Sequence, residues 1–530
     1  MSQFIKSSPV TSFGKWRGYF FPIHRHEFIK FLPMMAMLML IVFNYTILRN
    51  MKDSVIVTAA GAEVIPFIKV WVMLPCAVLI TLIFAKLTNR FSQEKVYYLM
   101  ISGFLICYGL FAFVLYPMRD ALHPHESALA LMDWLPEGFK GLVNMYRYWT
   151  FTLFYVVSEL WSSMIMTTLF WGLANEVYSV IEARRFYGVL TIAGNFAGII
   201  ASEVTVLVTS WTTSNSQGFA QDWESVMQYL IVAVIGAGIV SMGIFYWMNR
   251  TVLAAPVYEE LHSSIETIEH KKKKKKRLSM RESISYLSKS KYIICIAIIV
   301  VSYNLVINLV EVVWKDKVSQ LYPESVDYNT YMAHITIATN IISSTAAFFI
   351  SQILMACGWT RTALVTPIIM LVTCTGFFGF LFVQDNMVTP FAFLGATPLA
   401  IAVFFGGAQN CLSRAAKFSV FDATKEMSFI PLDHESKLKG KAAIDGVGSR
   451  LGKSGGSLIH QGLLMIFSTL SAITPFVGVI LMIVIIGWIA AVRMLGVQFN
   501  VIVDKQEREA NRKEPESVAS TLQECVPANA

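Results

Sequence analysis

Several charged side chains lie inside long apolar stretches of this sequence, where a charge is energetically costly. Arg49 and Lys52 lie three residues apart at the end of the first stretch, and Glu159 lies within the fourth. A charged side chain inside a membrane span costs at least ~2.5–3.5 kcal/mol, so it usually faces a partner or a water-filled cavity. Two cations on one helix face suit a polyanion, or they extend to the outer lipid headgroups. Glu159 either belongs to the same site or forms a structural ion pair with another span.

The second half of the chain carries a similar set of polar side chains. Asn304, Asn308 and Glu311 follow i, i+4, i+7 spacing, so they form one polar stripe on an otherwise apolar helix. The stripe predicts the wall of a cavity, although hydrogen bonding between helices would also place amides there. Arg450 and Lys453 lie three residues apart in a small-residue segment that can pack closely against a neighbour.

Two cation pairs, one from each half, could converge on one central cavity, and phosphate groups prefer such sites. Arginine binds phosphate oxygens bidentately, and lysine acts as a point charge. A nucleobase would need an aromatic or amide-lined pocket. The candidates, for which ordinary packing is the alternative, are Tyr45, Trp161, Trp171, Asn175, Phe404 and Phe405.

A phosphate-binding loop of the Walker type is excluded by one position. The segment Gly452-Lys453-Ser454 would complete the motif G-x-x-x-x-G-K-[ST], but Val447 stands where the first glycine is required. The segment also opens an apolar helix and follows no strand. We therefore expect no ATPase site here.

Metal and cofactor chemistry finds little support in the sequence. The seven cysteines are scattered and include no CxxC pair, which indicates neither a disulfide framework nor a zinc site. We expect no cofactor and no metal. Two His-x-His pairs lack further ligands and are predicted to be surface residues: His24 with His26, and His123 with His125.

The composition requires that most of the chain avoid water. Of its 530 residues, 55% are hydrophobic and only 15% are charged, whereas soluble domains carry about 25% charged residues. This excludes a soluble enzyme, a nucleic-acid-binding protein and a disordered chain.

The apolar stretches predict an all-α integral membrane protein. A spanning helix needs roughly 20 mostly apolar residues. Twelve stretches qualify: 29–48, 64–85, 97–117, 150–174, 186–209, 225–248, 292–314, 331–356, 362–384, 389–411, 447–470 and 473–497.

Lysines and arginines between these spans predict the orientation, because they are enriched in cytoplasmic loops. A cytoplasmic N-terminus leaves most of them inside, which predicts a multi-pass protein of the cell (inner) membrane with both termini cytoplasmic. The run Lys271 to Arg277 is then a linker near anionic lipid headgroups rather than a nucleic-acid site. The predicted inner loops also hold Arg184, Arg185, Arg361, Arg414, Lys417, Lys425 and Lys441.

The twelve spans divide into two similar halves. We predict a six-helix half at 1–248, a basic linker at 249–291, a second half at 292–497 and a polar tail at 498–530. The fourth span ends Phe170-Trp171-Gly172, and the tenth ends Phe404-Phe405-Gly406. Such a 6+6 repeat is the plan of major-facilitator-like carriers, in which the substrate site lies near the midplane.

The chain resembles a known family, the ATP/ADP translocases (nucleotide transporters) of obligate intracellular bacteria and plastids. The resemblance covers about 13–497. Stretches that match the family include Tyr45-Thr46-Ile47-Leu48-Arg49 with Lys52-Asp53, Ser158-Glu159-Leu160-Trp161, Phe170-Trp171-Gly172 and Ile307-Asn308-Leu309-Val310-Glu311-Val312. Two further stretches are the most specific: Phe421-Asp422-Ala423-Thr424-Lys425-Glu426-Met427, and Lys439-Gly440-Lys441-Ala442-Ala443-Ile444-Asp445 with Gly452-Lys453-Ser454-Gly455-Gly456.

The resemblance implies a twelve-helix, major-facilitator-like carrier that exchanges ATP for ADP and is not an enzyme. It implies functional roles for Lys52, Glu159, Glu311 and either Lys453 or Lys441. Asn50 stands where the family's exchangers commonly carry aspartate. This difference leaves open a proton-driven or broad-range importer of GTP, UTP, CTP or NAD on the same fold.

The expected partners are therefore a nucleotide, phosphate or a proton as co-substrate, and the lipid bilayer, with no nucleic acid. Two further alternatives are disfavoured. A membrane enzyme acting on lipid phosphates or nucleotide sugars would need an acidic metal motif such as DxD, and we find none. A carrier for another organic anion would leave the specific motifs unexplained.

Overall fold

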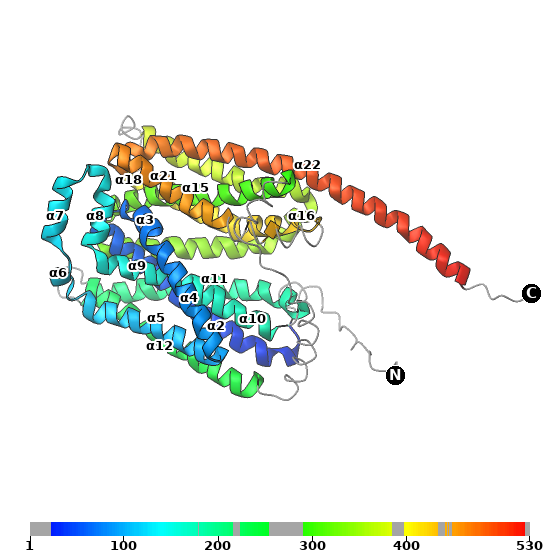
Figure 1. Cartoon of the computed structure of the whole chain (residues 1–530), viewed down its shortest axis with the longest axis horizontal. Coiled ribbons are helices and arrows are strands. Elements are labelled where there is room, and N and C mark those ends of the chain that lie inside the picture. The colour runs from blue at the N-terminus through cyan, green and yellow to red at the C-terminus, as the bar shows by residue number, and fades with distance from the viewer. Residues whose placement is uncertain are drawn as a thin grey trace, which may run out of the picture. The chain divides into compact units, whose positions relative to one another are not determined.

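The computed structural model describes residues 23–178, 180–215, 223–253, 290–383, 397–432, 440–441, 444 and 448–524. Regular elements in these ranges are all helical (Figure 1). Nine helices in this part of the chain are long and apolar enough to cross a membrane. The prediction of an all-α membrane protein agrees with this. The basic run at 271–277 and the first 22 residues lie outside the described ranges.

In its described residues, each predicted span falls on a helix or on consecutive helical segments, and residues 389–396 and 447 lie outside the described ranges. The helices are α2 (Phe28–Ala60), α3 and α4 (Val64–Phe67 and Leu74–Arg90), α5 (Gln93–Leu110), α9 and α10 (Trp149–Trp161 and Trp171–Val177), α11 (Val180–Asn215), α12 (Trp223–Met248), α15 (Lys291–Leu321), α16 (Ser325–Val383), α18 (Pro398–Ala416), α21 (Ser449–Phe467) and α22 (Leu470–Glu524). Helix α16 comprises two spans, because Gly358 breaks it with a φ of 73°.

The contacts within the chain divide it into two compact units. Unit 1 comprises Met1–Lys275 and Val318–Ile341, and unit 2 comprises Lys276–Lys317 and Ile342–Ala530. The C-terminal end of α15 and the start of α16 thus belong to unit 1. The four segments expected from the sequence stay a prediction.

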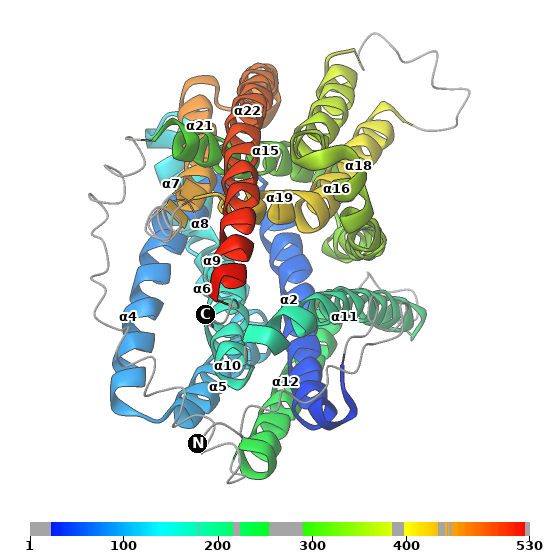
Figure 2. The ribbon, with the colours of Figure 1, turned by 90° about the vertical axis from the view of Figure 1, so that its right-hand side faces the viewer.

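Unit 1 is built around α2, whose neighbours are α9, α11 and α12 (Figure 2). Its polar groups fix those neighbours. Asn44 donates a hydrogen bond from Nδ2 to the carbonyl of Val234 on α12 at 3.0 Å. Trp161 on α9 donates from Nε1 to the carbonyl of Ile41 at 3.1 Å. Such bonds are worth forming because a buried polar group without a partner is costly in an apolar interior.

Short helices between α5 and α9 cover one end of unit 1 (Figure 1): α6 (Arg119–Leu122), α7 (His125–Trp134) and α8 (Lys140–Arg147). Asn144 on α8 donates to the carbonyl of Ala60, the last residue of α2, at 3.0 Å. The next residue, Gly61, has a φ of 86°, which favours glycine and lets the chain turn into α3. The connection between α5 and α9 is therefore attached to the end of the first span.

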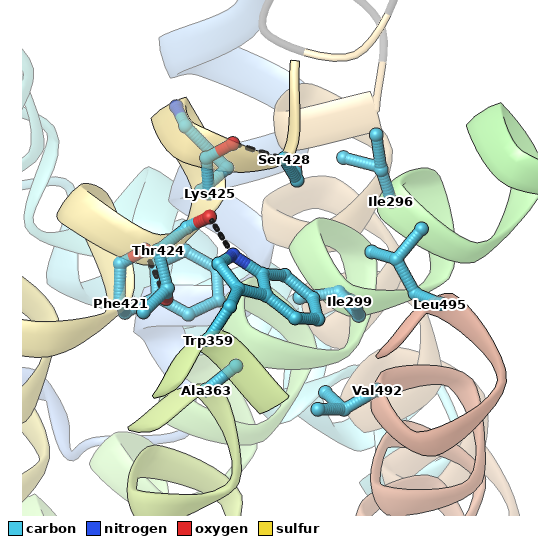
Figure 3. Close-up of a pocket in the computed structure, with 10 residues that line it drawn as sticks. All are labelled: Ile296, Ile299, Trp359, Ala363, Phe421, Thr424, Lys425, Ser428, Val492 and Leu495. Carbon is cyan, nitrogen blue, oxygen red and sulfur yellow. Dashed lines mark hydrogen bonds between the residues drawn. The ribbon is translucent and has the colours of Figure 1, made fainter. Parts of the chain in front are cut away.

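Unit 2 has α15 at its centre. An aromatic cluster joins Tyr303 to Phe421 and Trp488, with the Tyr303–Phe421 ring centroids 4.7 Å apart. A small apolar cavity lies beside the cluster, where the indole nitrogen of Trp359 donates to the carbonyl of Thr424 at 2.9 Å (Figure 3). Its remaining lining is mostly aliphatic: Ile296, Ile299, Ala363, Val492 and Leu495.

The tenth span extends further than the sequence predicts. Helix α18 continues without a break through the π-helical segment η9 (Lys417–Phe421) into α19 (Asp422–Ser428). Arg414 and Lys417 therefore lie in a helix and not in an irregular loop, and their placement on the inner side of the membrane stays a prediction. The charged residues lower the local hydropathy, but they are paired: Lys417 Nζ lies 3.3 Å from Asp422 Oδ2.

The repeated motifs of the fourth and tenth spans occupy different environments. Phe170 is 0% exposed, whereas Phe404 is 68% exposed. A Cβ on Gly172 would meet nothing within 4 Å, but a Cβ on Gly406 would lie 2.2 Å from Trp314 Cδ1. The similarity in sequence therefore does not extend to equivalent packing.

This difference predicts opposite effects of the same substitution. Gly406→Ala should destabilise the protein by about 1–3 kcal/mol, because the Trp314 ring is fixed by a hydrogen bond to Val403 and cannot easily move. Gly172→Ala, the matched control, should leave stability unchanged or slightly raised. Thermal unfolding in detergent measures both. Equal melting temperatures for the two variants would contradict the packing described here.

Candidate functional site

Lys52 is the centre of an ionic network inside unit 1. Its side chain is only 3% exposed. Its Nζ lies 3.0 Å from Asp53 Oδ1 and 3.3 Å from Glu159 Oε2, and 3.8 Å from the centre of the Tyr155 ring. One cation thus contacts two carboxylates and an aromatic face, all of which stabilise its charge where water is scarce.

The network joins two helices that the sequence had marked separately. Lys52 lies on α2, and Glu159 lies on α9, 34% exposed and three residues before the π-helical segment η5 (Ser162–Phe170). The structure therefore brings these two predicted site residues together. Arg49, one helical turn earlier on α2, is half-buried. Because a carboxylate and a phosphate both bind ammonium groups, the pair is compatible with a site whose cation changes partners.

A second network lies in unit 2, with the charges reversed. Glu311 Oε1 on α15 lies 3.1 Å from Lys315 Nζ and 3.1 Å from Arg414 Nη2 on α18. Arg414 also donates from Nε to Asn410 Oδ1 at 2.6 Å. One carboxylate here contacts two cations. Sequence analysis missed Arg414 as a site residue; the only signal was a basic residue ten positions after the Phe404 motif.

The predicted asparagine stripe of α15 is buried against α21. Asn304 and Asn308 donate from their amides to Val300 and Asn304 carbonyls, at 2.9 and 2.8 Å. A Cβ on Gly452 would lie 2.6 Å from Asn304 Cβ, and a Cβ on Gly456 would lie 3.1 Å from Asn308 Cβ. The glycines thus permit close packing of the two helices. Helix contact explains the position of both amides, and the role of Asn308 in transport stays a prediction.

The other predicted cations of the second half are more accessible. Arg450 and Lys453 on α21 are exposed. Lys441 is paired instead, through Nζ to Glu426 Oε2. The predicted convergence of these cations with Arg49 and Lys52 stays a prediction.

The nucleobase candidates separate into two groups. Trp161 is 1% exposed and packs edge-on against Phe104, at a centroid distance of 5.8 Å. Trp171 and Asn175 are instead linked by Tyr187: its ring lies 4.9 Å from Trp171, and its hydroxyl donates to Asn175 Oδ1 at 2.6 Å. The second group offers an accessible aromatic and amide surface at the end of the fourth span. Tyr45 is half-buried on α2, while Phe404 and Phe405 are exposed.

Two further ion pairs connect the start of α2 to α11. Lys30 Nζ lies 2.5 Å from Glu182 Oε1, and Arg185 binds both carboxylate oxygens of Glu27. Burial raises the pKa of Glu27, but the hydrogen bonds and charge of Arg185 outweigh it and bring the pKa below its usual value. These contacts join the first and fifth spans within unit 1.

Comparison with known proteins assigns the chain to a family. Residues 6–499 match the family described as TLC ATP/ADP transporter. The chain belongs to the TLC ATP/ADP transporter family. Members similar to it include ADP,ATP carrier protein 2 of Chlamydia pneumoniae, with 42% identity over 503 residues, covering 93% of each chain. ADP,ATP carrier protein 2, chloroplastic, of Arabidopsis thaliana is 38% identical over 94% of this chain and 79% of its own length. The chain is thus a membrane transporter and not an enzyme.

Solved structures identify the fold of this TLC transporter as major-facilitator-like. The E. coli xylose transporter XylE, in a partially occluded inward-open conformation, matches 86% of the chain with a TM-score of 0.51 and 12% identity; the match covers 96% of the XylE chain. A bacterial homologue of the iron transporter ferroportin matches 86% of the chain and 99% of its own, with a TM-score of 0.53 and 12% identity. The predicted fold class is confirmed.

The connection between α5 and α9 of the TLC transporter contains a buried histidine. His123 is 6% exposed, and its Nε2 lies 2.7 Å from Thr150 Oγ1. Phe151 packs edge-on against the ring at 4.7 Å. The prediction of a surface residue was wrong for His123, because neighbouring aromatic rings cover it. Burial, together with the nearby charge of His125, lowers the pKa of His123 to about 4.

This burial predicts a pH dependence of stability. A histidine whose folded-state pKa lies below 6.5 binds fewer protons when folded than when unfolded. Stability should therefore be complete above pH 6.5 and fall progressively toward about pH 4. Melting temperatures measured from pH 7.5 to about 4.5 should fall less steeply in His123→Gln than in the wild type. His334→Gln, at an exposed position, is the control and should keep the wild-type slope.

Proposed function

We propose that this protein exchanges nucleotides across the cell membrane, importing ATP against ADP by alternating access around a basic cavity. Membership of the family and the names of its relatives support the substrates. The observation that carries the proposal is the buried Lys52, held inside a membrane helix by carboxylates of its own unit. A cation in this position is maintained against a large desolvation cost, which favours a functional role.

Lys52 binds the nucleotide phosphates in this proposal, and Glu159 is the carboxylate that the phosphate replaces. Both partners are anionic oxygens at short range, so the cation is neutralised before and after the change. Tyr155 stays over the ammonium group during the exchange. Arg49 adds a second cation one turn away. Arg450 and Lys453, or Lys441, contribute from the second half, with Asn308 and Glu311 alongside them.

Obligate exchange follows from the same electrostatics. If the substrate leaves and no other anion enters, the carrier must pass through its occluded conformation while its binding-site cations have fewer anionic partners. Uncompensated buried charge costs several kcal/mol, so the empty carrier changes conformation slowly. A returning nucleotide removes this penalty. We further infer that the carrier resides in the inner membrane with both termini cytoplasmic, as the loop charges predict.

A proton-driven or broad-range importer is the second candidate. Its support is the partial exposure of Glu159, at 34%, which lets a carboxylate beside Lys52 reach water and take up a proton. Protonation would release Lys52 from Glu159 and so couple proton entry to substrate binding. The substrates would then include GTP, UTP, CTP or NAD, with Asn50 as the difference from the family's exchangers.

Preloaded vesicles distinguish the two candidates. In proteoliposomes containing the purified protein, labelled ATP uptake should rise at least about tenfold when ADP is inside, because the return step then carries a compensating anion. A protonophore should leave the uptake unchanged. Uptake that ignores internal ADP but collapses with the protonophore would support the importer instead.

Lys52→Ala should reduce ATP uptake to the background of empty vesicles, because the phosphate loses its buried cation. Lys140→Ala removes a lysine that is 59% exposed in the connection between α5 and α9 and should transport normally. Size-exclusion chromatography checks that both variants fold. Should Lys52→Ala aggregate, Lys52→Arg is the alternative variant. It keeps the positive charge but should transport poorly, because the planar guanidinium places its N–H donors differently from the lysine ammonium group. Wild-type uptake in a folded Lys52→Ala protein would refute the assignment.

A further inference from the structure

The two ionic networks occupy corresponding helices of the two halves with opposite charge. The first and fourth spans carry Lys52 and Glu159, and the first and fourth spans of the second half carry Glu311 and Arg414. Glu159 stands three residues before the π-helical segment η5, and Arg414 stands three residues before η9 (Lys417–Phe421). π-helical segments are frequent at functional sites. The fourth span of the first half thus carries a carboxylate, Glu159, where the fourth span of the second half carries a cation, Arg414.

Arg414 lies near the middle of the continuous helix formed by α18, η9 and α19. It follows the start of α18, at Pro398, by sixteen residues, and it precedes the end of α19, at Ser428, by fourteen. The exposed apolar residues of α18 lie on another face: from the mean direction of Phe404, Phe405 and Leu412, Arg414 is roughly 140° around the helix. Arg414 therefore leaves α18 on a different side from these three residues, whereas Phe418, four positions further on in η9, is itself 50% exposed.

Part of the Arg414 side chain remains accessible. It is 18% exposed, and exposure of a charged side chain to hydrocarbon is unfavourable. Its accessible part must therefore meet a water-filled space. Nε and Nη2 are bonded to Asn410 and Glu311, whereas Nη1 has no hydrogen-bond acceptor among the described residues. Asn410 Nδ2, in a residue only 2% exposed, is likewise without an acceptor in that part of the chain.

We propose that Arg414 binds a substrate phosphate, and that Asn410 and Glu311 position it. This inference rests on the proposed nucleotide transport and deepens it by adding a phosphate ligand in the second half. One edge of the planar guanidinium is held by the protein, and its other edge presents parallel N–H donors, the geometry that phosphate oxygens match. The adjacent amide of Asn410 supplies one more donor.

Glu311 has a second partner, which allows Arg414 to respond to substrate. Because Lys315 Nζ lies 3.1 Å from the same carboxylate oxygen, Glu311 remains paired when Arg414 moves toward a phosphate. Loss of Arg414 likewise leaves Glu311 with a cation. Arg414→Gln and Lys315→Gln each remove one of the two cations that neutralise Glu311, but only Arg414→Gln removes the proposed phosphate ligand. Lys315→Gln is therefore the matched control.

The test measures ATP-for-ADP exchange in proteoliposomes for four proteins: wild type, Arg414→Gln, Arg414→Lys and Lys315→Gln. Arg414→Gln should raise the KM for ATP about tenfold or more, as expected when a charge-assisted hydrogen bond is lost. Arg414→Lys should recover part of the lost affinity for ATP, because lysine restores the positive charge but not the two parallel N–H donors of the guanidinium. Lys315→Gln keeps both proposed phosphate donors, Arg414 and Asn410, so it should change the KM less than about threefold. Equal KM values for Arg414→Gln and Lys315→Gln would overturn the proposal in favour of a purely neutralising role.

A binding measurement makes the inference independent of the transported nucleotide. Inorganic tripolyphosphate should raise the melting temperature of the purified wild-type protein, but not that of Arg414→Gln. If the wild type exchanges no ATP yet shows this difference, the proposed function fails while the phosphate ligand stands. If the wild type exchanges ATP and Arg414→Gln matches it in KM and in stabilisation by tripolyphosphate, the ligand assignment fails alone.

Discussion

Ion pairing inside an apolar interior governs how the spans of this protein associate. A buried ammonium, guanidinium or carboxylate group loses most of its hydration, and an opposite charge within about 4 Å is the main compensation. Lys52 and Glu159 satisfy this requirement in unit 1, and Glu311 with Lys315 and Arg414 satisfies it in unit 2. In each half the pairing joins the first span to the fourth, so the same constraint that makes the charges tolerable also selects which helices are neighbours.

Close backbone approach is the second requirement, since lipid provides little hydrophobic force between helices. Gly406 lets Trp314 lie against α18, and Gly452 lets α21 lie against Asn304. These contacts use α15 from two sides. As a result, the polar stripe of α15 is divided: its amides pack against glycines, while Glu311 reaches the cations. Small residues and charges thus act together, because an ion pair between helices forms only where the backbones come close enough.

The ion pairs also give a physical basis for carrier behaviour. A carboxylate that neutralises a cation in the resting protein is similar in charge and geometry to a phosphate oxygen, so substrate can replace it without a large change in electrostatic energy. The two units arrange this differently. Lys52 contacts two carboxylates, whereas Glu311 contacts two cations. A phosphate arriving near Lys52 competes with anions already present, while one arriving near Arg414 adds to a set that holds more cations than anions.

The sequence by itself determined the membrane class, the approximate positions of the spans, the family, and three of the six ions that form the two networks: Lys52, Glu159 and Glu311. Composition and the length of the apolar stretches suffice for these, because a helix in a bilayer must form all its backbone hydrogen bonds within itself. Only the tertiary structure decided the partners. Arg414 was expected between two spans because charges end a hydropathy window, and its ion pair with Glu311 on another helix is visible in neither stretch of sequence alone. Trp161 and His123 are buried for the same reason: their surroundings come from residues distant in the chain, which a local pattern cannot contain.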